Sequence, residues 1–98
     1  MAVRASQRLD QKRAQVIEMV GRYPATNPRV FGSVLLGNDR HDSDIDLLVD
    51  PLPGATLFDL GNLQVELETI LGLRVDLLTP GDLPLKFRSQ VLAQAKPL

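Results

Sequence analysis

The sequence has no cysteine, no tryptophan and a single histidine among its 98 residues. The absence of cysteine excludes disulfide bonds, thiolate metal ligands and a cysteine nucleophile together, and it is typical of a protein that works in the reducing cytoplasm. The lone histidine, His41, cannot form a multi-histidine metal site within one chain. We therefore expect a cytoplasmic protein without a metal site of the cysteine or histidine type.

An excess of charge of one sign is also missing, because the formal net charge is only -1. Such a protein has no global basic field of the kind that attracts DNA or RNA, so any phosphate binding must be local and no direct nucleic-acid binding is expected. No long apolar run follows the basic first 15 residues, which argues against a signal peptide, a transmembrane helix and a membrane partner. With 44% hydrophobic and 23% charged residues, residues 1–98 are expected to form one small globular domain.

The hydrophobic pattern predicts alternating helices and strands. Pro24 and Pro28 are expected to bracket a turn after the first helix, and Gly72 is expected to cap the second. The order predicts a small mixed α/β domain, with a sheet of at least three strands and helices largely on one face. Helices are expected over residues 6–23, 56–71 and 83–95, and strands over residues 29–31, 43–50 and 73–78.

Two aspartates alternate with apolar residues on the strand expected over residues 43–50. Residues two apart on a strand project from the same face, so the carboxylates of Asp44 and Asp46 should lie close together and repel each other. One interpretation is that the pair faces solvent on an edge strand and discourages aggregation. The other is that a divalent cation lies between them, and oxygen ligands favour Mg²⁺ or Mn²⁺ over zinc.

A third aspartate, Asp76, repeats this arrangement on the strand expected over residues 73–78. If the two strands are neighbours, Asp76 could complete a site of three carboxylates and two metal ions. Asp50, next to Pro51, is interpreted as an ordinary residue at a strand end.

A glycine and a serine, Gly32 and Ser33, directly follow the strand expected over residues 29–31. Glycine lets a phosphate approach the backbone closely, and the first turn of a following helix offers free N-H groups and the serine hydroxyl to an anion. The alternative is an ordinary turn with a serine cap. The dipeptide gains meaning from its combination with the acidic residues on the later strands.

Gly32-Ser33, ten intervening residues and Asp44-Ile45-Asp46 together match the pattern G-S-x10-D-x-D. This pattern resembles the signature of the DNA polymerase beta-like nucleotidyltransferase superfamily, and in particular of its minimal nucleotidyltransferase (MNT) branch. The later segment L-R-V-D-L-L-T-P is similar to the strand that carries the third acidic residue of that family, here Asp76. The resemblance spans roughly residues 30–95, which is nearly the whole chain.

The resemblance implies a metal-dependent transfer of a nucleoside monophosphate from a triphosphate, usually ATP, to an acceptor hydroxyl. It implies that Gly32 and Ser33 hold the triphosphate and that Asp44 and Asp46 bind two ions, Mg²⁺ or alternatively Mn²⁺. It also implies that Asp76 binds the metal nearer the acceptor and helps to activate the hydroxyl.

Proteins of the MNT branch are commonly encoded beside a HEPN-domain ribonuclease toxin and act as its antitoxin. In some pairs the antitoxin transfers AMP to a tyrosine of the toxin. The resemblance therefore implies a hetero-oligomer with a HEPN toxin, in which the partner protein supplies the acceptor.

One position departs from the family pattern. Members often read G-S-x-A-R-G, whereas this chain has Leu36 in place of the arginine, and leucine offers no cation to a phosphate or a partner. Arg40 lies four residues further along and is interpreted as a solvated loop residue. Two alternatives to catalysis on the toxin follow: neutralisation by direct binding with a weakened nucleotide site, and, ranked last, transfer to a small molecule.

Overall fold

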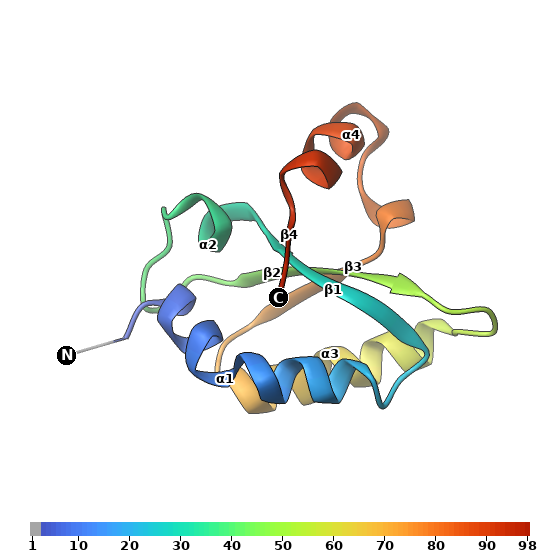
Figure 1. Cartoon of the computed structure of the whole chain (residues 1–98), viewed down its shortest axis with the longest axis horizontal. Coiled ribbons are helices and arrows are strands. Elements are labelled where there is room, and N and C mark those ends of the chain that lie inside the picture. The colour runs from blue at the N-terminus through green and yellow to red at the C-terminus, as the bar shows by residue number, and fades with distance from the viewer. Residues whose placement is uncertain (1–2) are drawn as a thin grey trace.

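The computed structural model describes residues 3–98, and this part of the chain folds into four α-helices, a 3-10 turn and four strands. The strands form one mixed sheet in the order β3-β2-β1-β4, in which β2 and β3 are parallel and the other neighbours are antiparallel (Figure 1). This topology confirms the predicted mixed α/β fold. In chain order the elements are α1 (Ala5–Val20), β1 (Ala25–Phe31), α2 (Gly32–Leu36), β2 (Ile45–Pro51), α3 (Leu57–Leu71), β3 (Val75–Leu78), η1 (Pro80–Asp82), α4 (Leu85–Gln94) and β4 (Lys96–Pro97).

The two long helices, α1 and α3, lie side by side and pack with the sheet into the hydrophobic core (Figure 1). Ile45, Leu47 and Val49 of β2 are completely buried there, which confirms the two-residue period predicted for this strand. The helices contribute residues at helical spacing, which places one apolar stripe of each against the sheet. These residues are Leu9, Val16 and Val20 of α1 and Leu63, Leu67 and Leu71 of α3.

The opposite, acidic face of β2 is also partly covered by protein. Leu48 lies on this face and is completely buried, and the 3-10 turn η1 contacts the strand. Leu83, directly after η1, is buried as well. A carboxylate on this face therefore lies among apolar groups, where an unpaired charge is costly.

The helix ends follow the expected chemistry. Thr56 and Asp59 form a reciprocal capping box at the start of α3, and Gly72 ends this helix in the left-handed conformation. The predicted second helix is thereby confirmed almost to the residue. Of the helices formed by residues 3–98, none is both long enough and apolar enough to cross a membrane.

The predicted turn at Pro28 is wrong, because β1 begins at Ala25 and contains this proline. The strand register shifts between Thr26 and Arg29, where Asn27 adopts a positive φ of 54°. Such a bulge tolerates proline because no ladder hydrogen bond has to be donated at that position. The two-residue strand β4 was not predicted, since it is too short to show an alternating pattern.

A buried carboxylate ties the start of α1 to the loop before β2. The Asp39 side chain is fully excluded from solvent and accepts hydrogen bonds of 2.7 Å from both the Arg4 guanidinium and the Ser6 backbone N-H. Arg4 also donates to the carbonyl of Gly37 at 2.9 Å. Burial alone would raise the pKa of Asp39, but these hydrogen bonds outweigh it and lower the pKa. Asp39 therefore stays ionised and holds the loop that connects the two halves of the G-S-x10-D-x-D motif.

We predict that Asp39→Ala lowers the free energy of unfolding by about 2–3 kcal/mol, because the Ser6 N-H and the Arg4 guanidinium both lose a charged acceptor. Denaturant unfolding followed by circular dichroism measures this. The matched control is Asp10→Ala, which breaks the exposed Asp10–Arg13 pair on α1 and should cost less than about 0.5 kcal/mol. Equal losses in the two variants would contradict a structural role for Asp39.

Candidate active site

The sheet brings two of the three predicted carboxylates together. Asp46 on β2 and Asp76 on β3 are directly opposite each other in the parallel pairing, so their side chains project from the same face of the sheet. Asp44 precedes the first residue of β2 by one position and lies two residues before Asp46. The condition that the sequence left open, adjacency of the strands that carry Asp46 and Asp76, is therefore met.

The Gly-Ser turn lies on the other side of Asp46. Phe31, the last residue of β1, pairs with Asp46 in the antiparallel ladder, and Gly32 follows at once with a positive φ of 73°. A Cβ atom at Gly32 would lie only 2.1 Å from Oδ2 of Asp46. An added side chain would force the Asp46 carboxylate to move, so glycine is favoured here both by its backbone conformation and by the carboxylate beside it.

The electrostatics of Asp46 reflect this crowding. Burial raises the pKa of its carboxyl, and repulsion by Asp76 and Asp44 together with a hydrogen bond to Asp76 adds to the effect, which brings the pKa to about 6. None of the ion pairs formed within residues 3–98 involves Asp44, Asp46 or Asp76. The site therefore carries an uncompensated negative charge, which a divalent cation would neutralise.

The exposure of the three aspartates fits a site shared with a ligand. Asp44 and Asp46 are half-buried, and Asp76 is exposed. Across residues 3–98, no three acidic or histidine side chains form a closed group able to hold a metal ion by themselves. Carboxylates in this arrangement suit Mg²⁺, which is usually bound by one or two carboxylates together with water and substrate phosphates.

The sequence did not reveal a second ionic group on the same face of the sheet. Arg29 of β1, whose side chain is 13% exposed, pairs with Asp50, and Asn27 donates to the same carboxylate at 3.0 Å. Asp50 is thus engaged at the end of its strand and its charge is neutralised locally. No motif marks this pair, because its members lie 21 residues apart and meet only through the β1–β2 pairing.

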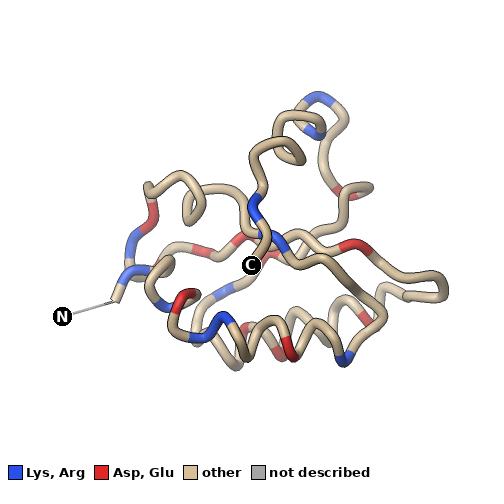
Figure 2. The backbone as a smooth tube through the Cα atoms, viewed as in Figure 1, with Lys and Arg blue, Asp and Glu red and all other residues tan. Residues whose placement is uncertain are grey.

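The end of the G-S segment and the loop after it lie at the surface. Leu36 ends α2 with 61% of its surface exposed, and Arg40 and His41 in the following loop are exposed too. Figure 2 shows basic and acidic positions interspersed along the described chain. The position of the family arginine is therefore an open, apolar spot beside Gly37.

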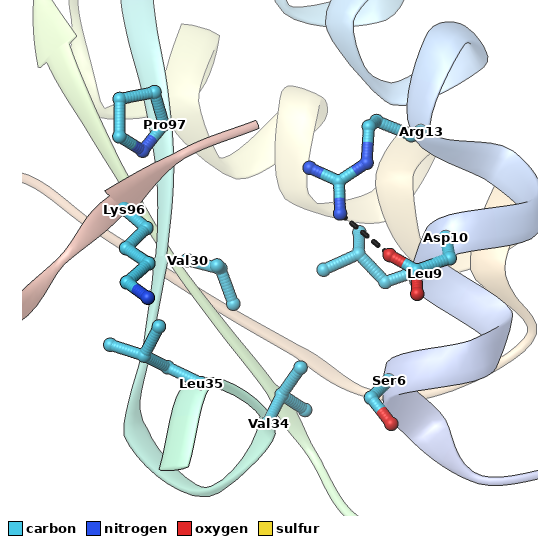
Figure 3. Close-up of a pocket in the computed structure, with 9 residues that line it drawn as sticks. All are labelled: Ser6, Leu9, Asp10, Arg13, Val30, Val34, Leu35, Lys96 and Pro97. Carbon is cyan, nitrogen blue, oxygen red and sulfur yellow. Dashed lines mark hydrogen bonds and ion pairs between the residues drawn. The ribbon is translucent and has the colours of Figure 1, made fainter. Parts of the chain in front are cut away.

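A cavity of about 300 Å³ lies between α1, α2 and β4 (Figure 3). Its lining combines aliphatic side chains, Leu9 and Val34 among them, with polar and charged ones such as Lys96. Asp10 and Arg13 on its rim bind each other at 2.6 Å, so their charges cancel. None of the three predicted aspartates lines this cavity.

A four-stranded mixed sheet that places a Gly-Ser turn and paired carboxylates on one face defines the nucleotidyltransferase class of fold. Residues 27–98 match the family described as "Polymerase beta, Nucleotidyltransferase", and the chain belongs to this family. Its members are transferases that generally use a nucleoside triphosphate and a divalent metal. The resemblance stated from the motif is thereby confirmed.

Two similar proteins are named as adenylyltransferases. One, from Methanocaldococcus jannaschii, is named "Putative protein adenylyltransferase MJ0435" and is 30% identical over 89% of this chain and 94% of its own length. The other, "Protein adenylyltransferase MntA" of Thermococcus cleftensis, is 36% identical over 79% of this chain and 78% of its own length.

Solved structures agree with the fold. The "Structure of putative minimal nucleotidyltransferase" is 43% identical and covers 95% of each chain, with a TM-score of 0.84. The "Crystal structure of the toxin-antitoxin with AMP-PNP" is 23% identical, with a TM-score of 0.73, and covers 86% of this chain and 69% of that one. At this identity the second similarity shows the fold alone.

We predict that Gly32→Ala destabilises the protein by about 3 kcal/mol or more, because it adds a clash with Asp46 to the strain of a positive φ. Gly37→Ala is the matched control, since Gly37 has a φ of 78° and no atom within 4 Å of an added Cβ. It should cost only about 1 kcal/mol. Thermal unfolding of the two variants measures the difference, and Asp46→Ala should relieve most of the excess in Gly32→Ala. An excess unchanged by Asp46→Ala would refute the proposed contact.

A second prediction concerns pH in the metal-free protein. A carboxyl pKa raised from 3.8 to about 6 favours the protonated form in the fold, so this contribution to stability is full below pH 4 and is lost as pH rises through 6. We expect Asp46→Asn to be more stable than the wild type by on the order of 2 kcal/mol at pH 7.5, with little difference at pH 4, after allowance for partial exposure.

Chemical denaturation at both pH values in EDTA measures this difference. Asp42→Asn, at an exposed position of the preceding loop, is the control and should match the wild type at both pH values. A stability gain for Asp46→Asn that is the same at pH 4 and pH 7.5 would show that the charge of Asp46 is not its cause.

Proposed function

We propose that this protein is an antitoxin that transfers AMP from ATP to a hydroxyl group, a tyrosine hydroxyl, of a cognate HEPN-domain ribonuclease toxin. The observation that carries the proposal is the position of Asp46, between Asp76 on one side and Gly32 on the other. Membership of the nucleotidyltransferase family and 36% identity to a protein adenylyltransferase support the reaction type.

In this proposal Gly32 and Ser33 bind the triphosphate. The missing side chain of Gly32 lets a phosphate approach both the backbone and the Asp46 carboxylate, and Ser33 contributes its hydroxyl and N-H. Asp44 and Asp46 would hold two Mg²⁺ ions, for which Mn²⁺ is an alternative, and Asp76 would be a ligand of the ion nearer the acceptor. Bound there, the ions would supply charge neutralisation at the triphosphate and activation of the attacking hydroxyl.

The chain itself then orients the reactants. The negative field of Asp44, Asp46 and Asp76 has no basic partner among residues 3–98 and favours a cation-bound nucleotide over a free one. The Arg4–Asp39 ion pair restrains the loop between Ser33 and Asp44, so the triphosphate-binding turn keeps its position relative to the carboxylates. In-line attack on the α-phosphorus requires this alignment.

The toxin would supply the acceptor and form a hetero-oligomer with this chain. Two of the solved structures with the same fold are described as toxin-antitoxin structures of MntA-HpeT mutants, and a third as a toxin-antitoxin with AMP-PNP. ATP is a cytoplasmic nucleotide, so the expected cytoplasmic location is part of the same proposal.

A second candidate function is neutralisation of the toxin by direct binding, with little or no catalysis. It is favoured by Leu36, which stands where many relatives carry an arginine and is 61% exposed. Compared with an arginine, an exposed leucine beside the site lacks the charge that binds a phosphate but offers an apolar surface to a protein partner.

Co-expression with a cognate HEPN-domain toxin, sought in the neighbouring reading frame, tests the proposal. We predict that the toxin gains one or more AMP units in intact mass spectrometry, and that α-phosphate-labelled ATP labels it in the presence of Mg²⁺. Asp44→Asn and Asp46→Asn should each lower the rate more than about a hundredfold, because a metal ligand is lost. Asp42→Asn, in the exposed loop just before, should leave the rate unchanged.

Two results would overturn the catalytic proposal. One is wild-type protein that binds the toxin but transfers no label in Mg²⁺ or Mn²⁺. The other is full neutralisation of toxicity by the Asp44→Asn/Asp46→Asn double variant, which would show that occlusion is sufficient and would favour the second candidate.

A further inference from the structure

The helix α4 is unusual among the helices of this fold because none of its residues is buried. It nevertheless carries large apolar side chains, of which Leu85 is 81% exposed and Phe87 is 50% exposed. In Figure 1 the helix projects from the sheet on the side away from α1 and α3. A helix gains most of its stability from packing an apolar face, so α4 has an apolar surface without a partner in this chain.

A groove of about 330 Å³ separates α4 from α2. Leu36 of α2 and Phe87 and Val91 of α4 supply its apolar part, and the amides of Gln90 and Gln94 supply its polar part. No charged side chain lines it. The lining therefore suits a neutral, largely apolar group that also carries a hydrogen-bonding atom.

The groove borders the candidate active site at Gly32, and the three aspartates lie beyond its lining. Gly32 lines the groove, and the space where its Cβ would be lies 2.1 Å from Oδ2 of Asp46. A group that fills the groove thus lies against Gly32, the residue that contacts the Asp46 side chain. No side chain that lines the groove offers a cation to phosphate charges, so the lining favours a neutral group over the triphosphate.

The rim of the groove indicates a protein occupant rather than a small molecule. Leu36 is 61% exposed and Phe87 is half-exposed, and both extend the apolar surface beyond the groove itself. The Lys86 ammonium lies 5.6 Å from the centroid of the Phe87 ring, which leaves the other ring face for a further contact. A free nucleotide in the groove would leave Leu85 at the start of α4 uncovered, because Leu85 lies outside the groove. A protein segment would cover both.

We propose that the groove between α2 and α4 is the docking site for the acceptor segment of the partner protein, and that it receives an aromatic side chain whose hydroxyl reaches the carboxylates. This inference rests on the proposed function for the identity of the acceptor. The apolar walls bind the ring, and the glutamine amides orient the segment that carries it. Leu36 then contributes to recognition of the acceptor, which accounts for an apolar residue at the position of the family arginine.

The experiment compares Phe87→Glu and the uncharged variant Leu36→Gln with the wild type and with Phe58→Glu. Phe58 is 84% exposed at the start of α3, outside the groove, so its substitution introduces the same charge on an equally accessible aromatic. Isothermal titration calorimetry measures two affinities for each protein, that for the purified HEPN-domain toxin and that for Mg-ATP without toxin. AMP transfer to the toxin is measured in parallel.

We expect both groove variants to weaken toxin binding about tenfold or more and to lower AMP transfer at limiting toxin to the same degree. The affinity for Mg-ATP should change less than about twofold, and Phe58→Glu should match the wild type in all three measurements. Because both positions are exposed, the variants should fold, and an unchanged circular dichroism spectrum for at least one of them is the required control.

Other outcomes overturn the inference. A loss of Mg-ATP affinity that parallels the loss of toxin affinity would assign the groove to the nucleobase. Unchanged toxin binding in both groove variants, or an equal loss of toxin affinity in Phe58→Glu, would show that the groove is not the docking site. The toxin-binding measurement does not depend on catalysis, so a wild type that binds toxin through the groove but transfers no AMP would contradict the proposed reaction and not the docking site.

Discussion

The close approach of three strands around one carboxylate is the constraint on which the rest of the site depends. Asp46 lies opposite Asp76 in a parallel pair and opposite Phe31 in an antiparallel pair, so its side chain is fixed between an acidic neighbour and the Gly32 backbone. β2 must therefore be a central strand of the sheet, and the residue after Phe31 must lack a side chain. The mixed topology and the glycine are two consequences of the same geometry.

The same arrangement makes the metal-free site electrostatically unfavourable. Burial and two like charges hold the pKa of Asp46 near 6, and Arg29, a basic residue on that face, is already bound to Asp50. The core of Ile45, Leu47 and Val49 on the other side of the strand offsets this cost. In this chain, stability thus comes from one face of β2, and the other face is available for binding a cation and a phosphate.

Outside the sheet, two segments complete the site in different ways. Arg4 and Asp39 restrain the loop between the two halves of the motif through a buried charge pair, and Arg4 lies outside the 27–98 region that matches the family. By contrast, α4 buries none of its residues and borders a neutral groove that ends at Gly32. The first segment supports the site within the chain, and the second leaves it open to a partner.

The sequence by itself determined the elements and the chemistry of the site. Local backbone preferences and side-chain burial produce the two-residue period of β2 and the cap at Gly72. The candidate site could be read from the spacing of Gly32, Ser33, Asp44 and Asp46 along the chain. Short or irregular segments escaped this reasoning, since a two-residue strand and a proline bulge leave no period to detect.

Only the tertiary structure decided which distant residues meet. Four contacts join residues that no spacing rule relates. They are the pairing of Asp46 with Asp76, the contact of Gly32 with Asp46, the Arg4–Asp39 pair and the Arg29–Asp50 pair. Strand order and register set these contacts, and they result from packing the whole core at once. The sequence therefore named the candidate carboxylates, and the fold decided that Asp46 and Asp76 share one face near an apolar groove.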